Sequence, residues 1–286
     1  MAIFRLLFIG DIVGDAGVSA VEYLLPILRE QYTIDFCVAN GENAHEGRGI
    51  NEVIVKKLYR SGVDVITGGD HSFDKHLIFP YMAKDNRLLR PMNYPKGAPG
   101  YGYGVYPYEK LNTLVAVINL RGQSFFNNPI RCPFYTIDRV LEEVRNQTNL
   151  IFLDFHAEAT AEKMAMAWYI DGRISAMAGS HTHVQTGDEQ IFPQGMGYIT
   201  DVGFTGPHDS VIGMDKTTAI NRFLLQTPQK YKLAEGNIKL HGVLFYIEPR
   251  TGKTQKVLRL SLPYEPPVLQ ETPQEVREIE QSSKVS

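Results

Sequence analysis

The stretch VITGGDHSFDK, residues 65–75, joins a short apolar run to two glycines and an acid–histidine pair, Asp70-His71. An apolar run of this kind is typical of a buried strand, and glycines after it allow the chain to turn tightly. The pair is then either the polar part of a turn or a metal ligand next to a proton donor. The other apolar runs of the chain help to decide between these interpretations.

An apolar run followed by potential metal ligands occurs at four other places. LLFIGD ends in Asp11, FCVANGEN in Glu42 and Asn43, IFLDFH in His156, and SAMAGSHTH in His181 and His183. In a parallel sheet the carboxyl ends of the strands lie along one edge, where open α/β folds hold their ligands. We therefore expect these residues and Asp70 to form one site.

Each of these residues taken alone has an ordinary alternative. Asp11 could be a turn or helix N-cap residue, and His156 could be a core or loop histidine. His181 and His183 would point the same way on an extended backbone, but they could reach two metals if the strand ends in a loop. The repeated placement at strand ends favours the joint site. Four histidines lie outside this pattern and are set aside: His45, His76, His208 and His241.

Apolar runs alternate with stretches of helical periodicity, which predicts an α/β fold with crossover helices. Strands are predicted at residues 4–9, 34–40, 63–67, 113–119, 149–155 and 174–180, and helices near 17–31, 51–61, 75–83, 136–147, 160–170 and 214–226. Pro26 should kink or break the first helix. Residues 238–249 and 254–262 predict an antiparallel hairpin beside the parallel strands. We expect one domain over 1–265 and a charged, loosely ordered C-terminal tail over 266–286.

The composition excludes some classes of function. The 286 residues are 43% hydrophobic, enough for a large core, and the formal net charge of −3 provides no broad basic field for non-specific binding of nucleic acid. A phosphate-bearing substrate would have to be attracted locally, by metal ions or a few cations. The two cysteines, Cys37 and Cys132, are too few for a disulfide framework and indicate the cytoplasm. No segment is long enough to span a membrane.

The expected ligands are carboxylates, an amide and imidazoles, without a thiolate. This set suits Mn, Fe, Mg or Zn, and its size favours two ions over one. Two neighbouring ions stabilise the attacking and leaving oxygens of a displacement at phosphorus, so phosphoester hydrolysis is the leading reaction class. A histidine that is near the ions without binding them would protonate the leaving oxygen.

The motifs GD, GEN, GDH, DFHAEAT and GSHTHVQT, together with MNYPKGAPG and YITDVGFTGP, resemble those of the YmdB-like metallophosphoesterases over residues 4–260. These bacterial proteins of the calcineurin-like superfamily are described as phosphodiesterases of 2′,3′-cyclic nucleotides. The resemblance implies a four-layer α/β/β/α sandwich with a dinuclear site at the carboxyl ends of its strands. It also implies two divalent ions, Fe or Mn before Mg or Zn.

The resemblance further implies a role for each site residue. Asp11, Asn43 and His183 would bind one ion, Asp70, His156 and His181 would bind the other, and Glu42 would bridge the two. His71 would be the proton donor. The superfamily usually has Gly-Asn-His where this chain has Gly69-Asp70-His71. The aspartate keeps an oxygen ligand but adds negative charge beside the ions.

The function that these features predict is a metal-dependent phosphoric diester hydrolase acting on small phosphodiesters such as 2′,3′-cyclic nucleotides, or on RNA ends. Two alternatives stay open. One is a phosphomonoesterase or protein phosphatase on the same metals, and the other is a weakly catalytic regulatory protein related to nucleotides or RNA. The oligomeric state is also open, a homo-oligomer included.

Overall fold

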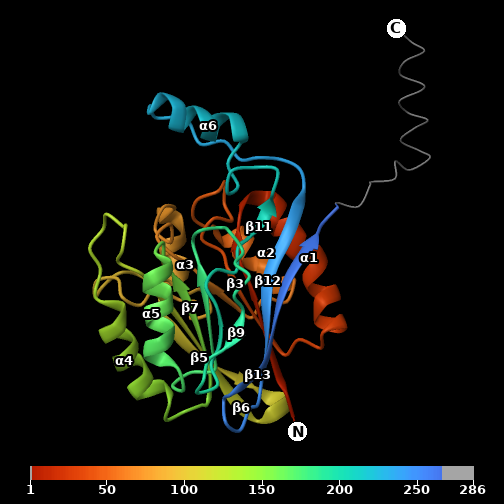
Figure 1. Cartoon of the computed structure of the whole chain (residues 1–286), viewed down its shortest axis with the longest axis vertical. Helices are drawn as coiled ribbons and strands as arrows, with labels where there is room; N and C mark the ends of the chain where they lie inside the picture. Colours follow the sequence, from red (N-terminus) through yellow and green to blue (C-terminus); the bar gives the residue numbers. More distant parts are fainter. Residues whose placement is uncertain (1, 266–286) are drawn as a thin grey trace, which may run out of the picture.

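The computed structural model describes residues 2–265, and the predicted tail over 266–286 lies outside them. Two β-sheets lie face to face, and helices cover their outer faces (Figure 1). The predicted four-layer α/β/β/α sandwich is therefore confirmed. Within residues 2–265, no helix combines the length and the apolar character that crossing a bilayer requires.

The first sheet contains three of the predicted parallel strands in the order β1, β3, β4. Its seven strands are β1 (Phe4–Ile9), β2 (Asp11–Ile12), β3 (Phe36–Asn40), β4 (Val65–Thr67), β11 (Phe204–Pro207), β12 (Ile238–Ile247) and β13 (Thr254–Pro263). The predicted hairpin is β12 and β13. It lies beside the parallel strands as predicted, because β12 pairs antiparallel with β1 in the same sheet.

The second sheet has a parallel centre, β6, β7, β8 and β10, with antiparallel strands β5 and β9 at its edges. Its strands are β5 (Tyr103–Tyr108), β6 (Thr113–Arg121), β7 (Leu150–His156), β8 (Ala176–Ser180), β9 (Gln190–Ile191) and β10 (Gly197–Ile199). The expected strand ends therefore belong to two sheets and not to one, which the apolar runs alone could not reveal.

Alternate residues of each central strand face two different cores. In β1, Leu7 and Ile9 pack under the helices, whereas Leu6 and Phe8 pack between the sheets. The ring of Phe8 lies 5.0 Å from that of Phe152 on β7 of the other sheet. Strands that are buried on both faces read as continuous apolar runs, which explains why the strand positions could be recognised in the sequence.

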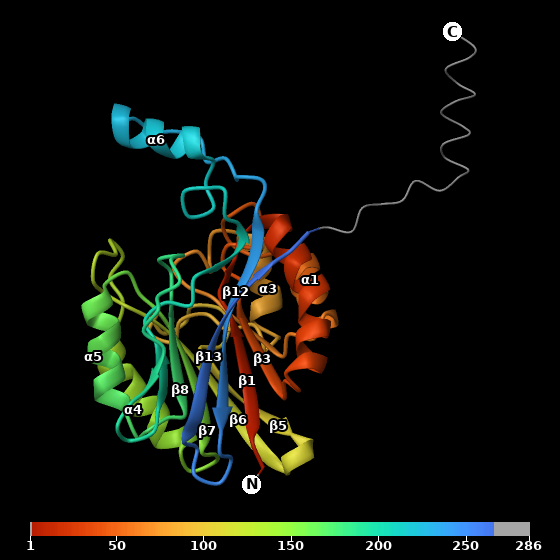
Figure 2. The same ribbon diagram turned by 45° about the vertical axis from the view of Figure 1, so that its right-hand side comes forward.

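Helices α1 and α2 cover the first sheet, and α4 and α5 cover the second (Figures 1 and 2). Their bounds are α1 (Gly14–Gln31), α2 (Glu52–Arg60), α3 (Phe79–Met82), α4 (Pro133–Val144), α5 (Thr160–Ile170) and α6 (Lys216–Leu225), with short 3-10 turns at His76–Ile78 and Glu109–Leu111. Helix α1 continues through Pro26, so the helix does not break there. Helix α6 projects from the top of the molecule in Figure 1.

Candidate metal centre

The expected ligands come from the ends of five strands and meet where the two sheets are closest to α6. Asp11 begins β2 just after β1, Glu42 and Asn43 follow β3, Asp70 follows β4, His156 ends β7, and His181 and His183 follow β8. Three of these segments belong to the first sheet and two to the second. The centre therefore lies across both sheets.

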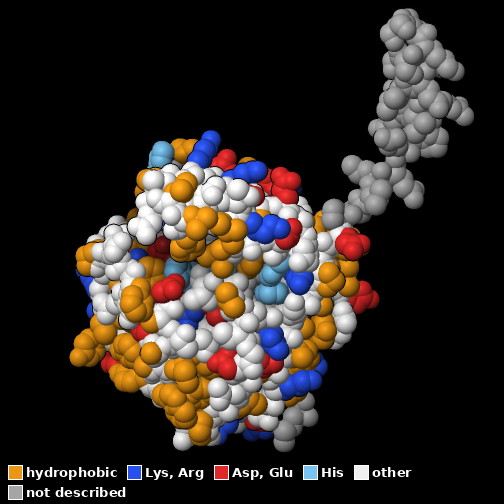
Figure 3. All heavy atoms as spheres, turned by 45° about the horizontal axis from the view of Figure 1, so that its top comes forward, with side chains coloured by type: hydrophobic (Ala, Val, Ile, Leu, Met, Phe, Trp, Pro, Cys, Tyr) orange, Lys and Arg blue, Asp and Glu red, His pale blue; other side chains and the backbone are white. Residues whose placement is uncertain are grey.

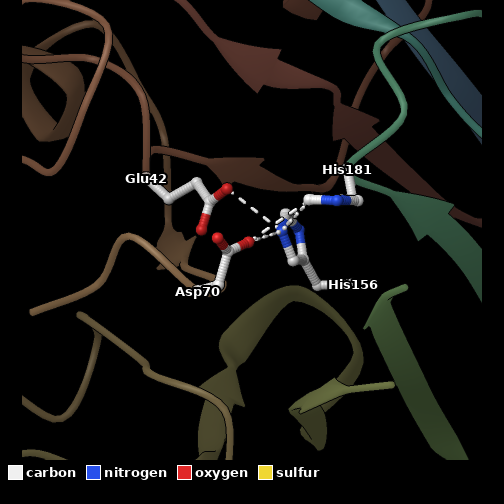
Figure 4. A group of neighbouring side chains, drawn as sticks. All are labelled: Glu42, Asp70, His156 and His181. Atoms are coloured by element: carbon white, nitrogen blue, oxygen red, sulfur yellow. Dashed lines mark hydrogen bonds and ion pairs between the residues drawn. The ribbon is translucent and has the colours of Figure 1, made fainter. Parts of the chain in front are cut away.

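Four of these side chains form a tight cluster, which we call the metal cluster: Glu42, Asp70, His156 and His181 (Figure 4). Each offers a ligand atom, and these atoms all lie within 4.8 Å of one another. His156 Nε2 lies 3.0 Å from Glu42 Oε1 and 3.1 Å from Asp70 Oδ1. His181 Nδ1 lies 3.3 Å from the same Asp70 oxygen. Two carboxylates and two imidazoles directed at one point can hold a divalent ion.

The other three expected ligands, Asp11, Asn43 and His183, lie beside the metal cluster. Asn43 Nδ2 is 3.2 Å from His183 Nε2 and 3.4 Å from Glu42 Oε1, and a half-turn of the amide would present its oxygen to the same place. Asp11 Oδ1 is 3.9 Å from His183 Nε2. This oxygen is buried without a hydrogen-bond partner among the described residues, which is costly unless a cation satisfies it. The residues present therefore fit a second ion.

His156 is held in place by buried residues behind it. Its Nδ1 lies 3.0 Å from Ser180 Oγ, and the Ser180 hydroxyl donates a 2.6 Å hydrogen bond to Asp154. Thr67 Oγ1 and Asn40 Nδ2 donate to the other Asp154 oxygen at 2.6 and 3.1 Å. Burial raises the pKa of Asp154 to about 7. These contacts direct His156 Nε2 toward the metal cluster, as outer partners of metal-binding histidines do.

His181 and His183 are held by a different device, because they lie on a loop. Both have left-handed backbone conformations, with φ of 96° and 63°. Between them, the Thr182 amide and hydroxyl donate to Asp201 Oδ2 at 3.1 and 2.7 Å. Lys163 of α5 donates to the same oxygen at 2.7 Å, and this ion pair is fully buried. The buried pair therefore anchors the loop that presents both histidines.

The charges of the metal cluster favour a bound cation. Burial lowers the pKa of His156, but the carboxylates of Glu42, Asp70 and Asp11 raise it well above its ordinary value. Burial raises the pKa of Asp70, but hydrogen bonds from His156 and His181 hold it well below its usual range. A proton on His156 and a metal ion would therefore compete for the same place.

Gly69 is needed for space rather than for a left-handed turn. A Cβ atom at this position would lie 2.2 Å from Glu42 Oε2 and 2.4 Å from His156 Nε2. Neither Gly68 nor Gly69 has a positive φ, so the glycines are not needed for a left-handed turn. Gly69 instead lets the backbone pass close to the side chains of the metal cluster.

His71 lies beside the metal cluster at the wall of a cavity of about 470 Å³. Its Nδ1 is 3.0 Å from Asp74 Oδ2, which orients the ring, and its Nε2 is 3.7 Å from Asp70 Oδ2. The cavity is also lined by Arg48, Tyr231 and residues of α6. The structure thus brings together all eight residues that the sequence placed in one site.

A sequence profile of the YmdB-like protein family matches residues 7–260. The chain belongs to the YmdB-like family. This YmdB-like protein is 46% identical, over 90% of its length and 96% of the relative's, to the 2′,3′-cyclic-nucleotide 2′-phosphodiesterase of Bacillus subtilis. That relative is named as a phosphoric diester hydrolase, the class of enzyme that the sequence motifs imply.

Two solved structures share the fold of this YmdB-like protein. A hypothetical protein from Thermus thermophilus has a TM-score of 0.85 and 36% identity, covering 92% of this chain and 100% of the other. A novel phosphatase from Mycoplasma pneumoniae has a TM-score of 0.87 and 30% identity, covering 93% and 96%. These matches confirm the predicted fold.

Sequence reasoning missed the residues of this YmdB-like protein that hold the ligands. Asp154 is a single acid within an otherwise apolar strand, which was the one available signal. Ser180, Asp201 and Lys163 have no local pattern that distinguishes them from turn or surface residues. Their roles follow from contacts between segments far apart in the chain.

Proposed function

We propose that this chain is a dinuclear metal-dependent phosphodiesterase that hydrolyses small phosphodiesters, 2′,3′-cyclic nucleotides first. The observation that carries the proposal is the metal cluster at the wall of a cavity large enough for a nucleotide. The identity to the Bacillus phosphodiesterase supports the same substrate class. The two free cysteines, of which Cys37 is buried, support a place in the reducing cytoplasm.

Two groups of ligands would hold the two ions. Asp70, His156 and His181 would bind one, and Asp11, Asn43 and His183 the other, with Glu42 between them. The position of Glu42 supports this division, because its Oε1 lies 3.0 Å from His156 and 3.4 Å from Asn43. Mixed oxygen and imidazole ligands suit Fe or Mn, and also Mg or Zn.

Arg48 is placed to bind the phosphate of the substrate. It is exposed at the cavity wall and makes no ion pair with any carboxylate of residues 2–265. A guanidinium recognises phosphate oxygens through two parallel hydrogen bonds. Arg48 would therefore orient the diester over the metal cluster, where three carboxylates would otherwise repel it.

The proposed chemistry is attack of water on phosphorus, which breaks the bond from phosphorus to one ester oxygen, the leaving oxygen. Bound divalent ions would supply an activated water and neutralise charge on the phosphate oxygens. The chain's own contribution is the proton: His71 Nε2 would give its proton to the leaving oxygen, while Asp74 keeps Nδ1 protonated and fixes the ring. This step produces a neutral imidazole and an alcohol.

The test begins with metal-free protein and adenosine 2′,3′-cyclic monophosphate. Adding Mn or Fe should create hydrolysis, and His71→Ala should keep metal binding while lowering kcat by about 10²- to 10⁴-fold, the range for loss of a general acid. His76→Ala, an exposed histidine five residues later, is the matched control and should be unaffected. Full activity of His71→Ala would remove His71 from its proposed role.

The same assay distinguishes phosphodiesterase activity from phosphatase activity. A phosphatase is what the Mycoplasma pneumoniae structure is named as. Adenosine 2′,3′-cyclic monophosphate and adenosine 3′-monophosphate are compared under identical metal concentrations. A higher kcat/KM for the cyclic diester is expected. A preference for the monoester would replace the proposal with a phosphomonoesterase.

A further inference from the structure

A second cavity of about 430 Å³, whose wall contains no residue of α6, adjoins the metal cluster, and we call it the loop cavity. Its distinctive wall is the loop over residues 122–131, which follows β6. The loop cavity and the α6-side cavity share Arg48, His71 and His181. The metal cluster therefore lies where two separate cavities meet.

The loop over 122–131 is anchored firmly. The Glu162 carboxylate of α5 accepts hydrogen bonds from the backbone amides of Gln123 and Ser124 at 2.8 and 3.0 Å. Farther along, the buried Arg121 guanidinium donates to the Asn128 carbonyl at 2.7 Å. These bonds fix the loop close to both of its ends, so its shape is set before any ligand binds.

Phe126 joins this loop to a proposed metal ligand. Its ring centroid lies 4.9 Å from that of His181, and the Arg121 guanidinium lies over the Phe126 ring at 4.5 Å. These contacts explain why the chain has an aromatic residue at position 126.

The contacts of the neighbouring residue, Phe125, do not explain why it is aromatic. Its side chain is 84% exposed, and its backbone has φ of 66°, a conformation that costs free energy for a residue with a large side chain. The adjacent side-chain amides of Asn127 and Asn128 are exposed and make no hydrogen bonds within residues 2–265. An anchored loop thus holds an exposed aromatic ring and two unbonded side-chain amides at the wall of the loop cavity.

Figure 3 views the side of the molecule that α6 caps, where hydrophobic and histidine side chains lie at the surface.

We propose that the loop cavity is a nucleobase subsite, so that the enzyme binds linear phosphodiesters with a nucleoside on each side of the phosphate. Phe125 would stack on one base, and Asn127 and Asn128 would bond to its edge. The other nucleoside would occupy the α6-side cavity, with Arg48 on the phosphate between them. A cyclic mononucleotide has one base and fills only one cavity. This inference rests on the proposed function, and it extends the substrate class to dinucleotides and short single-stranded oligonucleotides.

The test compares two ligands on metal-loaded protein by isothermal titration calorimetry, with hydrolysis-resistant phosphorothioate forms of adenylyl-3′,5′-adenosine and of adenosine 2′,3′-cyclic monophosphate. Phe125→Ala should weaken binding of the linear dinucleotide about tenfold, equivalent to about 1.4 kcal/mol, and leave binding of the cyclic nucleotide unchanged, because only the dinucleotide loses a stacked base. Phe125→Trp should restore binding. Tyr135→Ala removes another highly exposed aromatic residue, on α4, that lines neither cavity, and should change the affinity for neither ligand.

The outcomes separate this inference from the proposed function. Equal weakening of both ligands, or of neither, would overturn the nucleobase subsite whatever the enzyme hydrolyses. Failure of the wild-type protein to hydrolyse either cleavable diester would overturn the proposed function, while the binding comparison would still test the subsite. If both hold, Phe125→Ala should raise KM for the linear dinucleotide by a similar factor and leave its kcat unchanged.

Discussion

Two groups of histidines lie near Phe204 and differ in almost every other respect. One is the metal cluster, to which His183 is adjacent, and the ring of His183 stacks on Phe204 at 5.2 Å. The other is the pair His208 and His241, with ring centroids 4.3 Å apart and His208 stacked on Phe204 at 4.2 Å. Both groups contain a buried imidazole, so burial alone does not distinguish them.

The difference lies in the charges around the two buried rings. Carboxylates surround His156 and raise its pKa well above the ordinary value, despite the opposing effect of burial. Burial first, and then the charges of His208, Lys239 and Arg259, together lower the pKa of His241 to about 3. A metal ion would be attracted to the first group and repelled from the second. Carboxylates, more than the number of histidines, therefore make a cation site in this fold.

The largest expected effect comes from a matched pair of substitutions, His156→Gln and His241→Gln. His156→Gln should lower metal occupancy and kcat/KM by more than about 100-fold, since loss of outer partners of a ligand alone costs 10- to 100-fold. His241→Gln should leave both unchanged. Elemental analysis and turnover of a cyclic nucleotide would measure this, and equal losses in the two variants would remove the distinction between the groups.

The next effect concerns the buried ion pair that anchors the loop carrying His181 and His183. Lys163→Met should leave the Asp201 charge buried without its partner and lower the free energy of unfolding by about 3–5 kcal/mol. Metal affinity should fall as well, because Lys163 no longer holds Asp201, the acceptor of both Thr182 hydrogen bonds. The free energy is measured by urea unfolding, and the affinity by metal titration at a temperature where the variant is folded.

Lys56→Met is the control for this substitution, because Lys56 pairs with Glu52 on the surface of α2. It should cost no more than about 0.5 kcal/mol. A Lys163→Met variant with the stability and metal affinity of Lys56→Met would show that the buried pair does not support the loop.

The smallest effect is a pH dependence that should have opposite signs in the two groups. His241 has a folded pKa of about 3 and an unfolded pKa near 6.5, so the unfolded state alone gains a proton between these values. Stability should therefore fall as the pH falls from about 6.5 toward 3, by at most about 2 kcal/mol between pH 7 and pH 5. Urea unfolding of His241→Gln should show a shallower loss over this window.

His156 should behave in the opposite way in metal-free protein. Its folded pKa is raised, so its contribution to stability is present below pH 6.5 and is lost as the pH rises through the folded pKa. The contrary outcome concerns His241. If His241→Gln loses as much stability toward acid as the wild-type protein does, His241 is not the group responsible.

The sequence was sufficient to predict most strands and the residues that follow them. Strand β1 was predicted at its observed bounds, because strands buried on both faces read as continuous apolar runs. The polar residues at the ends of β3, β4, β7 and β8 converge as expected. His208 and His241 were set aside from the metal ligands, and they lie in a group without carboxylates. Strands β2, β9, β10 and β11 were missed because they have only two to four residues each, and the six-residue edge strand β5 was also missed.

The support of the site could not be predicted in the same way. A lysine in the middle of a helix normally faces water, yet Lys163 is fully buried against Asp201. Asp154 is an acid between two apolar residues of its strand, and its hydrogen-bond partners Thr67 and Ser180 come from other strands. Such residues depend on partners that only the folded chain brings near, so no local pattern reveals them.

The division of the ligands between two sheets has a consequence for the lifetime of the protein in a cell. Glu42 and Asp70 follow strands of the first sheet, and His156 and His181 lie at strand ends of the second, so an ion bound between them would tie together the two halves of the sandwich. Ligand binding to the folded state alone adds about 2.7 kcal/mol at a hundredfold excess over the dissociation constant. Metal supply would then control how often the sheets separate, and with it the rate at which proteases degrade the chain.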